Sequence, residues 1–210
     1  MASRLFYSAV KNLFKLFFTL YNRLEVMGFD NIPHGVPFIV ASNHASYIDP
    51  PLIGGVLPVR LRYLAKESLF RVPLIGFFVK ALGSIPVKRE DGQKAGAVMK
   101  GMLTLLGNGD SILLFPEGSR SPDGRIKPLE AGVAFLSVKA GVPVLPVYIA
   151  GSFKALPRGR CALRPSKLRL SISPPIYPDS GIANERERRD ALLKSLETTL
   201  LSMEAAADVH

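Results

Sequence analysis

The N-terminal residues place apolar and polar side chains on opposite sides of a helix. The apolar set recurs at helical spacing and consists of Leu5, Phe6, Val10, Leu13, Phe14, Phe17, Leu20, Tyr21 and Leu24. The polar set consists of Arg4, Ser8, Lys11, Lys15, Thr19 and Asn22. Phe18 alone interrupts the polar side. This pattern predicts an amphipathic helix over residues 1–24.

The predicted N-terminal helix fits two roles. Lys15 divides its apolar stretch, so the helix does not reach the roughly 20 uncharged residues of a membrane-spanning helix. It lacks the cleavage site of a signal peptide, so we expect it to be retained. Such a helix either packs on the protein core or lies flat in the headgroup region of an anionic bilayer. The absence of any acidic residue before Glu25 favours the bilayer.

Beyond this helix, short apolar runs alternate with helical stretches. The pattern predicts strands over residues 36–42, 62–65, 84–87, 111–115, 142–149 and 168–173. It predicts helices over residues 51–57, 72–82, 93–106 and 131–140. Pro143 and Pro146 indicate that residues 142–149 form a strand end or an edge strand.

The alternation predicts an α/β fold over residues 25–183. We expect a single layered domain with a partly parallel central sheet flanked by helices. Ligands of such sheets bind beyond the carboxyl ends of the strands. Residues 184–210 are expected to form a solvated C-terminal helix with a frayed end.

Composition restricts the function classes. The 210-residue chain is 48% hydrophobic, which suffices for one domain and excludes disorder as its main state. Its net charge of +10 leaves nucleic acid, an anionic membrane surface and phosphorylated small molecules as partners. A single cysteine, Cys161, excludes an internal disulfide framework and fits a reducing compartment. The histidines lack a metal-ligand spacing, so we expect no metal and no cofactor.

A histidine and an acid follow the first predicted strand after the N-terminal helix. His44 and Asp49 are five residues apart in the segment Asn43-His44-Ala45-Ser46-Tyr47-Ile48-Asp49. A carboxylate that accepts from one imidazole nitrogen fixes the tautomer, which leaves the other nitrogen to act as a general base. Alternatively, His44 is structural and Asp49 is the N-cap of a helix that begins at Pro50. The chain has no serine or cysteine nucleophile elbow, so direct attack by a substrate hydroxyl is the simpler route.

Two further motifs lie at the ends of predicted strands. The segment Phe115-Pro116-Glu117-Gly118-Ser119-Arg120 combines an arginine fork suited to phosphate oxygens with a glycine that permits close backbone approach. The segment Gly83-Ser84-Ile85-Pro86-Val87-Lys88-Arg89 ends in two cations. Either segment, taken alone, also fits an ordinary turn or a solvated strand end.

Together these motifs resemble those of the glycerolipid acyltransferases that act on 1-acyl-glycerol 3-phosphate. Four blocks occur in the order of that family: Asn43-His44-x-Ser46-x-x-Asp49, Gly83-x-Ile85-Pro86-x-x-Arg89, Phe115-Pro116-Glu117-Gly118-Ser119-Arg120 and Val142-Pro143-Val144-Leu145-Pro146-Val147. The resemblance covers about residues 23–175.

The resemblance implies a role for each candidate site residue. His44 would take the proton of the acceptor hydroxyl as that hydroxyl attacks an acyl thioester, and Asp49 would orient the imidazole. The residues that would bind the glycerol phosphate are Arg89, Glu117, Gly118, Ser119 and Arg120, assisted by Lys88. The apolar residues 69–82 would form a wall for the acyl chain. Family members often carry a lysine where this chain has Glu130, so either Lys127 replaces that lysine or the phosphate site is weaker.

The implied reaction moves a fatty acyl group from acyl-CoA or acyl carrier protein to the sn-2 hydroxyl of lysophosphatidic acid, giving phosphatidic acid for phospholipid synthesis. The implied location is the cytoplasmic face of an anionic membrane, as a peripheral or monotopic protein. Two alternatives remain: acylation of another lyso-lipid or of glycerol 3-phosphate, and a non-catalytic basic module that binds anionic lipid. Nucleic acid is disfavoured as a partner, because the aromatic residues do not interleave with the cations.

Overall fold

A seven-stranded sheet forms the centre of the part of the chain that the computed structural model describes, namely residues 4–66, 71, 85–87, 95–157, 159–160 and 162–208. The strands are β1 (Glu25–Met27), β2 (Ile39–Ser42), β3 (Leu61–Lys66), β4 (Ile85–Val87), β5 (Ser111–Leu114), β6 (Val144–Ala150) and β7 (Arg169–Ile172). Their order is β1-β7-β6-β2-β5-β3-β4. Neighbouring strands run parallel except β6 and β7, which are antiparallel. The predicted α/β fold with a partly parallel sheet is confirmed.

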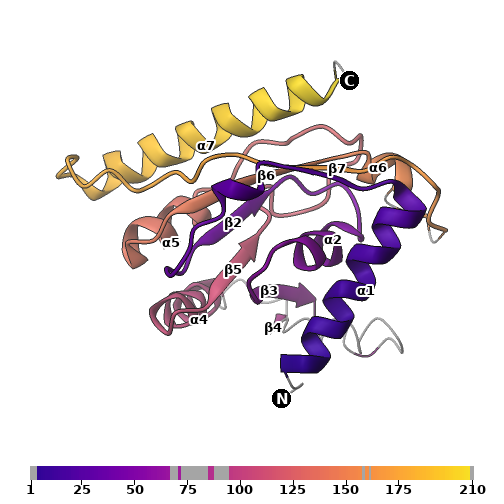
Figure 1. Ribbon diagram of the computed structural model, residues 1–210. Helices are drawn as coiled ribbons and strands as arrows, with labels where there is room; N and C mark the ends of the chain where they lie inside the picture. The colour runs from indigo at the N-terminus through magenta and orange to yellow at the C-terminus, as the bar shows by residue number, and fades with distance from the viewer. Residues whose placement is uncertain are drawn as a thin grey trace.

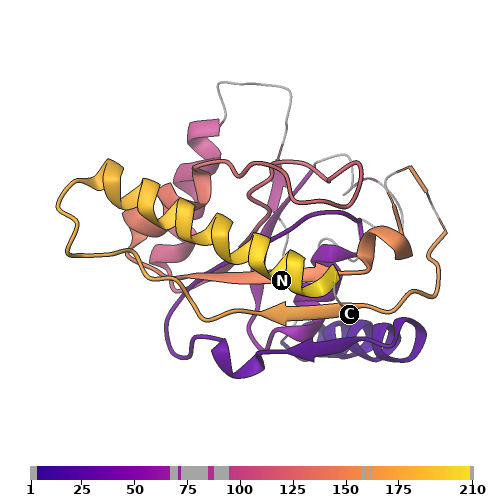
Figure 2. The same ribbon diagram turned by 90° about the horizontal axis from the view of Figure 1, so that it is seen from above.

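Helices cover both faces of the sheet, so the fold has three layers (Figure 1). One face carries α1 (Arg4–Asn22) and α2 (Asp49–Val56). The other carries α4 (Ala95–Gly107), α5 (Gly132–Ala140) and α7 (Glu185–Asp208), and Figure 2 shows α7 lying across the sheet. The short helices η1 (Phe29–Asn31) and α6 (Ser152–Ala155) and the strand β1 were not predicted, because three or four residues hold too little periodicity to identify an element.

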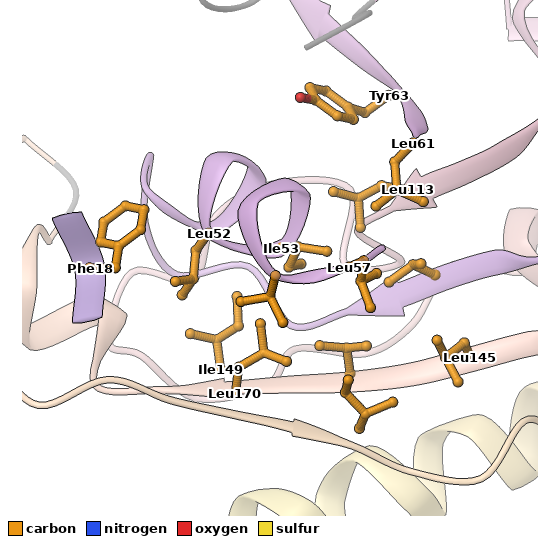
Figure 3. Packing of buried hydrophobic residues seen from close by; sticks show 14 of the residues in the cluster. Phe18, Leu52, Ile53, Leu57, Leu61, Tyr63, Leu113, Leu145, Ile149 and Leu170 are labelled. Atoms are coloured by element: carbon orange, nitrogen blue, oxygen red, sulfur yellow. The ribbon is translucent and has the colours of Figure 1, made fainter. Parts of the chain in front are cut away.

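The central strands β2, β5 and β6 read as nearly continuous apolar runs because both of their faces are buried. Successive side chains of a strand point to opposite faces. Phe38 and Val40 accordingly pack in the cluster beneath α1 and α2, whereas Ile39 and Ala41 pack beneath α4, α5 and α7. Figure 3 shows the first cluster, in which Leu52, Ile53 and Leu57 of the α2 region lie above Ile149 of β6 and Leu170 of β7.

The two prolines of the β6 segment occupy different positions. Pro143 directly precedes β6, as expected for a strand end. Pro146 lies inside β6, between β7 and β2, so the edge-strand alternative is wrong. The carbonyl of Pro146 accepts the backbone N–H of Ser173 at 3.0 Å, one residue beyond the last β6–β7 pair, Val147 and Ile172. The missing proline N–H therefore falls where the ladder ends and costs little.

The helix α1 packs on the core through a face that matches the predicted apolar side only in part, since Val10 belongs to that side and Tyr7 and Phe18 do not. Tyr7, Val10 and Phe18 are buried, and Phe18 is only 2% exposed although it interrupts the predicted polar side. The backbone of α1 lies close to Gly55 of α2, where an added Cβ would come within 3.3 Å of the Lys15 nitrogen. A glycine at position 55 thus permits the close approach of the two helices.

A second apolar face of α1 remains exposed. Leu13, Leu16, Phe17 and Leu20 lie at successive helical spacings and are 59%, 56%, 42% and 73% exposed. The helix therefore has one apolar face that joins the core and another that does not. Among the described residues, no helix has the length and hydropathy needed to span a bilayer.

The C-terminal helix α7 is attached to the core by one stripe of residues. Leu192, Leu196 and Leu200 are at most 3% exposed, and Glu204 continues their four-residue spacing at 8% exposed. The expectation of a solvated helix is wrong for this face, because the overall charge of the segment obscured its repeating leucines. The predicted helix over residues 72–82 lies outside the described residues.

Candidate active site

His44 and Asp49 meet at the carboxyl end of β2. Nδ1 of His44 lies 2.9 Å from Oδ2 of Asp49, whose side chain is fully buried. The same oxygen accepts the backbone N–H groups of Ala45 and Ser46 at 2.8 and 2.7 Å. Since this carboxylate oxygen accepts hydrogen bonds, Nδ1 of His44 donates and Nε2 is left as a proton acceptor.

The helix-capping alternative for Asp49 does not describe this geometry. Asp49 is the first residue of α2, the N-cap position is Ile48, and no side chain caps that end. The hydrogen bonds of Asp49 run back into the loop that carries His44. The carboxylate therefore organises the His44 loop rather than the end of α2.

Contacts with Phe115, Ile149 and Leu156 hold the His44 loop in place. The imidazole stacks on the ring of Phe115, with 4.0 Å between centroids and 19° between planes. The side-chain amide of Asn43 donates to the carbonyl of Ile149 and accepts its N–H, at 3.1 and 2.8 Å. The hydroxyl of Ser46 donates to the carbonyl of Leu156 at 2.7 Å. His44 is left partly accessible, with 17% of its side chain exposed.

Glu117 bridges two backbone segments. One of its carboxylate oxygens accepts the N–H of His44 at 2.7 Å, and the other accepts the N–H of Lys127 at 3.1 Å. The residue is 5% exposed, and this burial raises the pKa of its carboxyl, against the lowering effect of the two backbone hydrogen bonds. Glu117 thus joins the His44 loop to the segment that follows the 115–120 motif.

The loop from Gly118 to Arg120 follows directly. Gly118 has a φ of 68°, and an added Cβ would lie 2.1 Å from a carboxylate oxygen of Glu130, so a glycine fits here. The hydroxyl of Ser119 accepts a hydrogen bond from Nζ of Lys127 at 2.7 Å. The cation that contacts Ser119 is therefore Lys127, whereas position 130 carries an anionic glutamate.

The Arg120 guanidinium lies over the ring of Tyr47, with 3.5 Å between Cζ and the ring centroid. Its Nη1 atom is buried and has no hydrogen-bond partner in the described part of the chain. The backbone N–H of Ser121 donates to the carbonyl of His44 at 2.7 Å, which fixes the arginine next to the His44 loop. A buried guanidinium N–H without an acceptor suits an anionic ligand.

The structure brings six of the eight predicted site residues together, namely His44, Asp49, Glu117, Gly118, Ser119 and Arg120. Lys88 and Arg89 lie outside the described residues, as does most of the predicted acyl-chain wall over residues 69–82. In the described part of the chain, no group of three or more His, Cys, Asp or Glu side chains could hold a metal ion.

Sequence reasoning missed a support of the site that comes from α7. A carboxylate oxygen of Glu204 accepts the N–H of Ile126 at 3.1 Å, and Asp208 pairs with Arg125. Ile126 directly precedes Lys127, so these contacts hold the segment that Glu117 also binds. The four-residue repeat of buried positions from Leu192 to Glu204 was the signal for this packing.

Comparison with known proteins agrees with these motifs. A family model described as acyltransferase matches residues 23–150. A chloroplastic 1-acyl-sn-glycerol-3-phosphate acyltransferase of Brassica napus is 30% identical over 178 residues, covering 84% of this chain and 52% of that protein. The 1-acyl-sn-glycerol-3-phosphate acyltransferase of Bacillus subtilis is 26% identical over 204 residues, covering 96% and 98%.

Among solved structures, the 1-acyl-sn-glycerophosphate acyltransferase PlsC of Thermotoga maritima superposes with a TM-score of 0.80. It is 31% identical, and the match covers 98% of this chain and 84% of that one. The chain spans about half the length of the plant relatives that it matches.

Proposed function

The chain belongs to the acyltransferase family, and we propose that it transfers a fatty acyl group from a thioester to the sn-2 hydroxyl of 1-acyl-glycerol 3-phosphate. The observation that carries this proposal is the contact between Nδ1 of His44 and Oδ2 of Asp49 at 2.9 Å. It provides an oriented general base at the carboxyl end of a parallel strand, where α/β proteins bind their ligands. The names of the relatives supply the substrate class.

The chemistry needs no covalent enzyme intermediate. Nε2 of His44 accepts the proton of the acceptor hydroxyl while the hydroxyl oxygen attacks the thioester carbonyl carbon. The tetrahedral intermediate then collapses, the carbon–sulfur bond breaks, and the imidazolium returns its proton to the leaving thiolate. Asp49 stabilises the imidazolium between these steps. Acyl-CoA and acyl carrier protein present the same thioester, so either donor fits this sequence of steps.

The loop at the end of β5 binds the acceptor phosphate in this proposal. The donors are Nη1 of Arg120, which has no partner among the described residues, and the ammonium of Lys127, which also donates to the Ser119 hydroxyl. Lys88 and Arg89 complete the phosphate site by the family resemblance. Because both oxygens of Glu117 hold backbone N–H groups, we assign Glu117 to the support of this loop instead of to direct contact with the substrate.

The protein works, in this proposal, on the surface of an anionic membrane. The exposed apolar face of α1, formed by Leu13, Leu16, Phe17 and Leu20, would enter the headgroup region, as amphipathic helices do. The lysophospholipid and the acyl product partition into the same layer. We place this surface on the cytoplasmic side, since the single cysteine fits a reducing compartment.

The test is acyl transfer from labelled acyl-CoA, and separately from acyl carrier protein, to lysophosphatidic acid in anionic vesicles. The variant His44→Ala should lose about 10²–10⁴-fold in rate while vesicle binding is unchanged. The matched control is His34→Ala, because His34 is an exposed histidine outside the site, and it should keep full turnover.

Full turnover in His44→Ala would contradict the mechanism. Vesicle binding by the unaltered protein without transfer from either donor would favour the non-catalytic lipid-binding module. Parallel assays with glycerol 3-phosphate and with lyso-lipids of other head groups identify the acceptor.

A further inference from the structure

Tyr47 has an aromatic ring that the proposed chemistry does not use. It lies between His44 and Asp49 in sequence, and it is 52% exposed although its neighbours Ser46 and Ile48 are buried. Its ring contacts the Arg120 guanidinium at 3.5 Å from Cζ to the centroid. This contact between an aromatic face and a cation adds to the backbone and Glu117 hydrogen bonds that already join the two segments.

The contact restricts the arginine. An arginine side chain has many rotamers of similar energy, and a guanidinium stacked on an aromatic face is held to few of them by cation–π attraction. The Nη1 atom of the restrained group is buried and has no acceptor among the residues that the structure describes. Leaving a buried guanidinium N–H unpaired is unfavourable, so its position is explained best by an anionic oxygen that binds there.

We propose that Tyr47 is the positioning residue that aims Arg120 at the phosphate of the acceptor. The proposal rests on the function stated above. Because Tyr47 and His44 belong to one loop that Asp49 and Glu117 fix, the stacked arginine is held at a set separation from the general base. Tyr47 and Arg120 thereby favour acceptors in which the distance between the phosphate and the free hydroxyl matches the distance between the Arg120 guanidinium and the His44 imidazole.

The test compares Tyr47→Phe, which keeps the ring face, with Tyr47→Leu, which removes it. Tyr47→Leu should raise the KM for lysophosphatidic acid about 2- to 5-fold, the range of an exposed cation–π contact, with kcat changed less than twofold. Tyr47→Phe should restore the KM to within about twofold of the unaltered protein. The matched control Tyr177→Leu, at an exposed tyrosine outside the site, should leave both constants unchanged.

A double-mutant cycle with Arg120→Ala separates this inference from the proposed function. Tyr47→Leu should add nothing to the KM in the Arg120→Ala background, because the ring then has no guanidinium to hold. The inference would be overturned if Tyr47→Leu raised the KM equally in both backgrounds, or if Tyr47→Phe raised the KM as much as Tyr47→Leu does. A higher KM in Arg120→Ala would still support the phosphate site. If Arg120→Ala leaves the KM unchanged, both the phosphate site and the role of Tyr47 are wrong.

Discussion

A carboxylate oxygen of Glu117 accepts the backbone N–H of His44 at 2.7 Å, which joins two motifs that are 73 residues apart in the chain. The second oxygen accepts the backbone N–H of Lys127, so one buried side chain fixes both the loop that carries His44, the proposed general base, and the loop beside the proposed phosphate site. Through these two contacts, Glu117 supports the geometry of the candidate site.

The buried carboxyl of Glu117 should make stability depend on pH in one direction. Burial raises its pKa above the ordinary value of 4.5, so between the two values the folded state binds a proton that the unfolded state has released. This group therefore stabilises the fold at low pH, and the contribution is lost as the pH rises through the raised pKa.

Comparison with Glu117→Gln isolates this effect, because glutamine does not titrate. The free energy of unfolding of the unaltered protein, minus that of the variant, should fall as the pH rises above about 4.5. Urea unfolding at a series of pH values measures the difference. A difference that grows with pH would contradict the assignment.

Asp49→Asn should lower kcat by about 10²-fold or more and leave the KM of the acceptor nearly unchanged. An amide in place of the carboxylate cannot stabilise the imidazolium, and its one carbonyl oxygen must replace an acceptor of three hydrogen bonds. Steady-state kinetics in vesicles measure both constants. In the His44→Ala background the same substitution should cost much less, and an undiminished loss there would show that Asp49 acts independently of His44.

Mutations should distinguish the roles of the two apolar faces of α1. The double variant Leu16→Glu, Leu20→Glu should bind anionic vesicles at least about 10-fold more weakly with an unchanged melting temperature, because both side chains are exposed. Phe18→Ala should instead destabilise the fold by about 3–5 kcal/mol. Co-sedimentation and thermal unfolding measure the two effects.

The control for membrane binding is Leu201→Glu, at an exposed leucine on the opposite layer of the fold. It should leave binding unchanged. Deleting residues 1–22 is a poorer experiment, since Tyr7, Val10 and Phe18 belong to the core. Unaltered binding of the double variant would refute the membrane role of the exposed face.

Glu204 on α7 should influence the site through Ile126. Glu204→Ala leaves the N–H of Ile126 without its acceptor, which should cost about 1–3 kcal/mol of stability and raise the KM for the acceptor. Glu204→Gln retains a carbonyl oxygen and should recover most of both effects. The control is Glu197→Ala, at an exposed position on the same helix. A KM equal to that of the unaltered protein in Glu204→Ala would show that the contact serves stability alone.

The sequence predicted local features well where they depend on periodicity or on residues close in the chain. The buried strands β2 and β5 and the helix α4 were anticipated from apolar runs and helical spacing. The contact between His44 and Asp49 was also anticipated, because a strand-to-helix turn brings residues five apart within reach. Elements as short as β1 and α6 were not, since so few residues carry no distinct period.

By itself, the sequence determined the layered α/β fold, the motifs at the strand ends and the amphipathic character of α1. Tertiary structure alone decided that Phe18 enters the core, that Glu117 accepts hydrogen bonds from two backbone segments, and that Tyr47 lies beneath Arg120. A periodic pattern reports which residues share a face, but not which neighbour covers that face. That choice depends on packing between segments far apart in the chain, and it exists only once the sheet and its helices have come together.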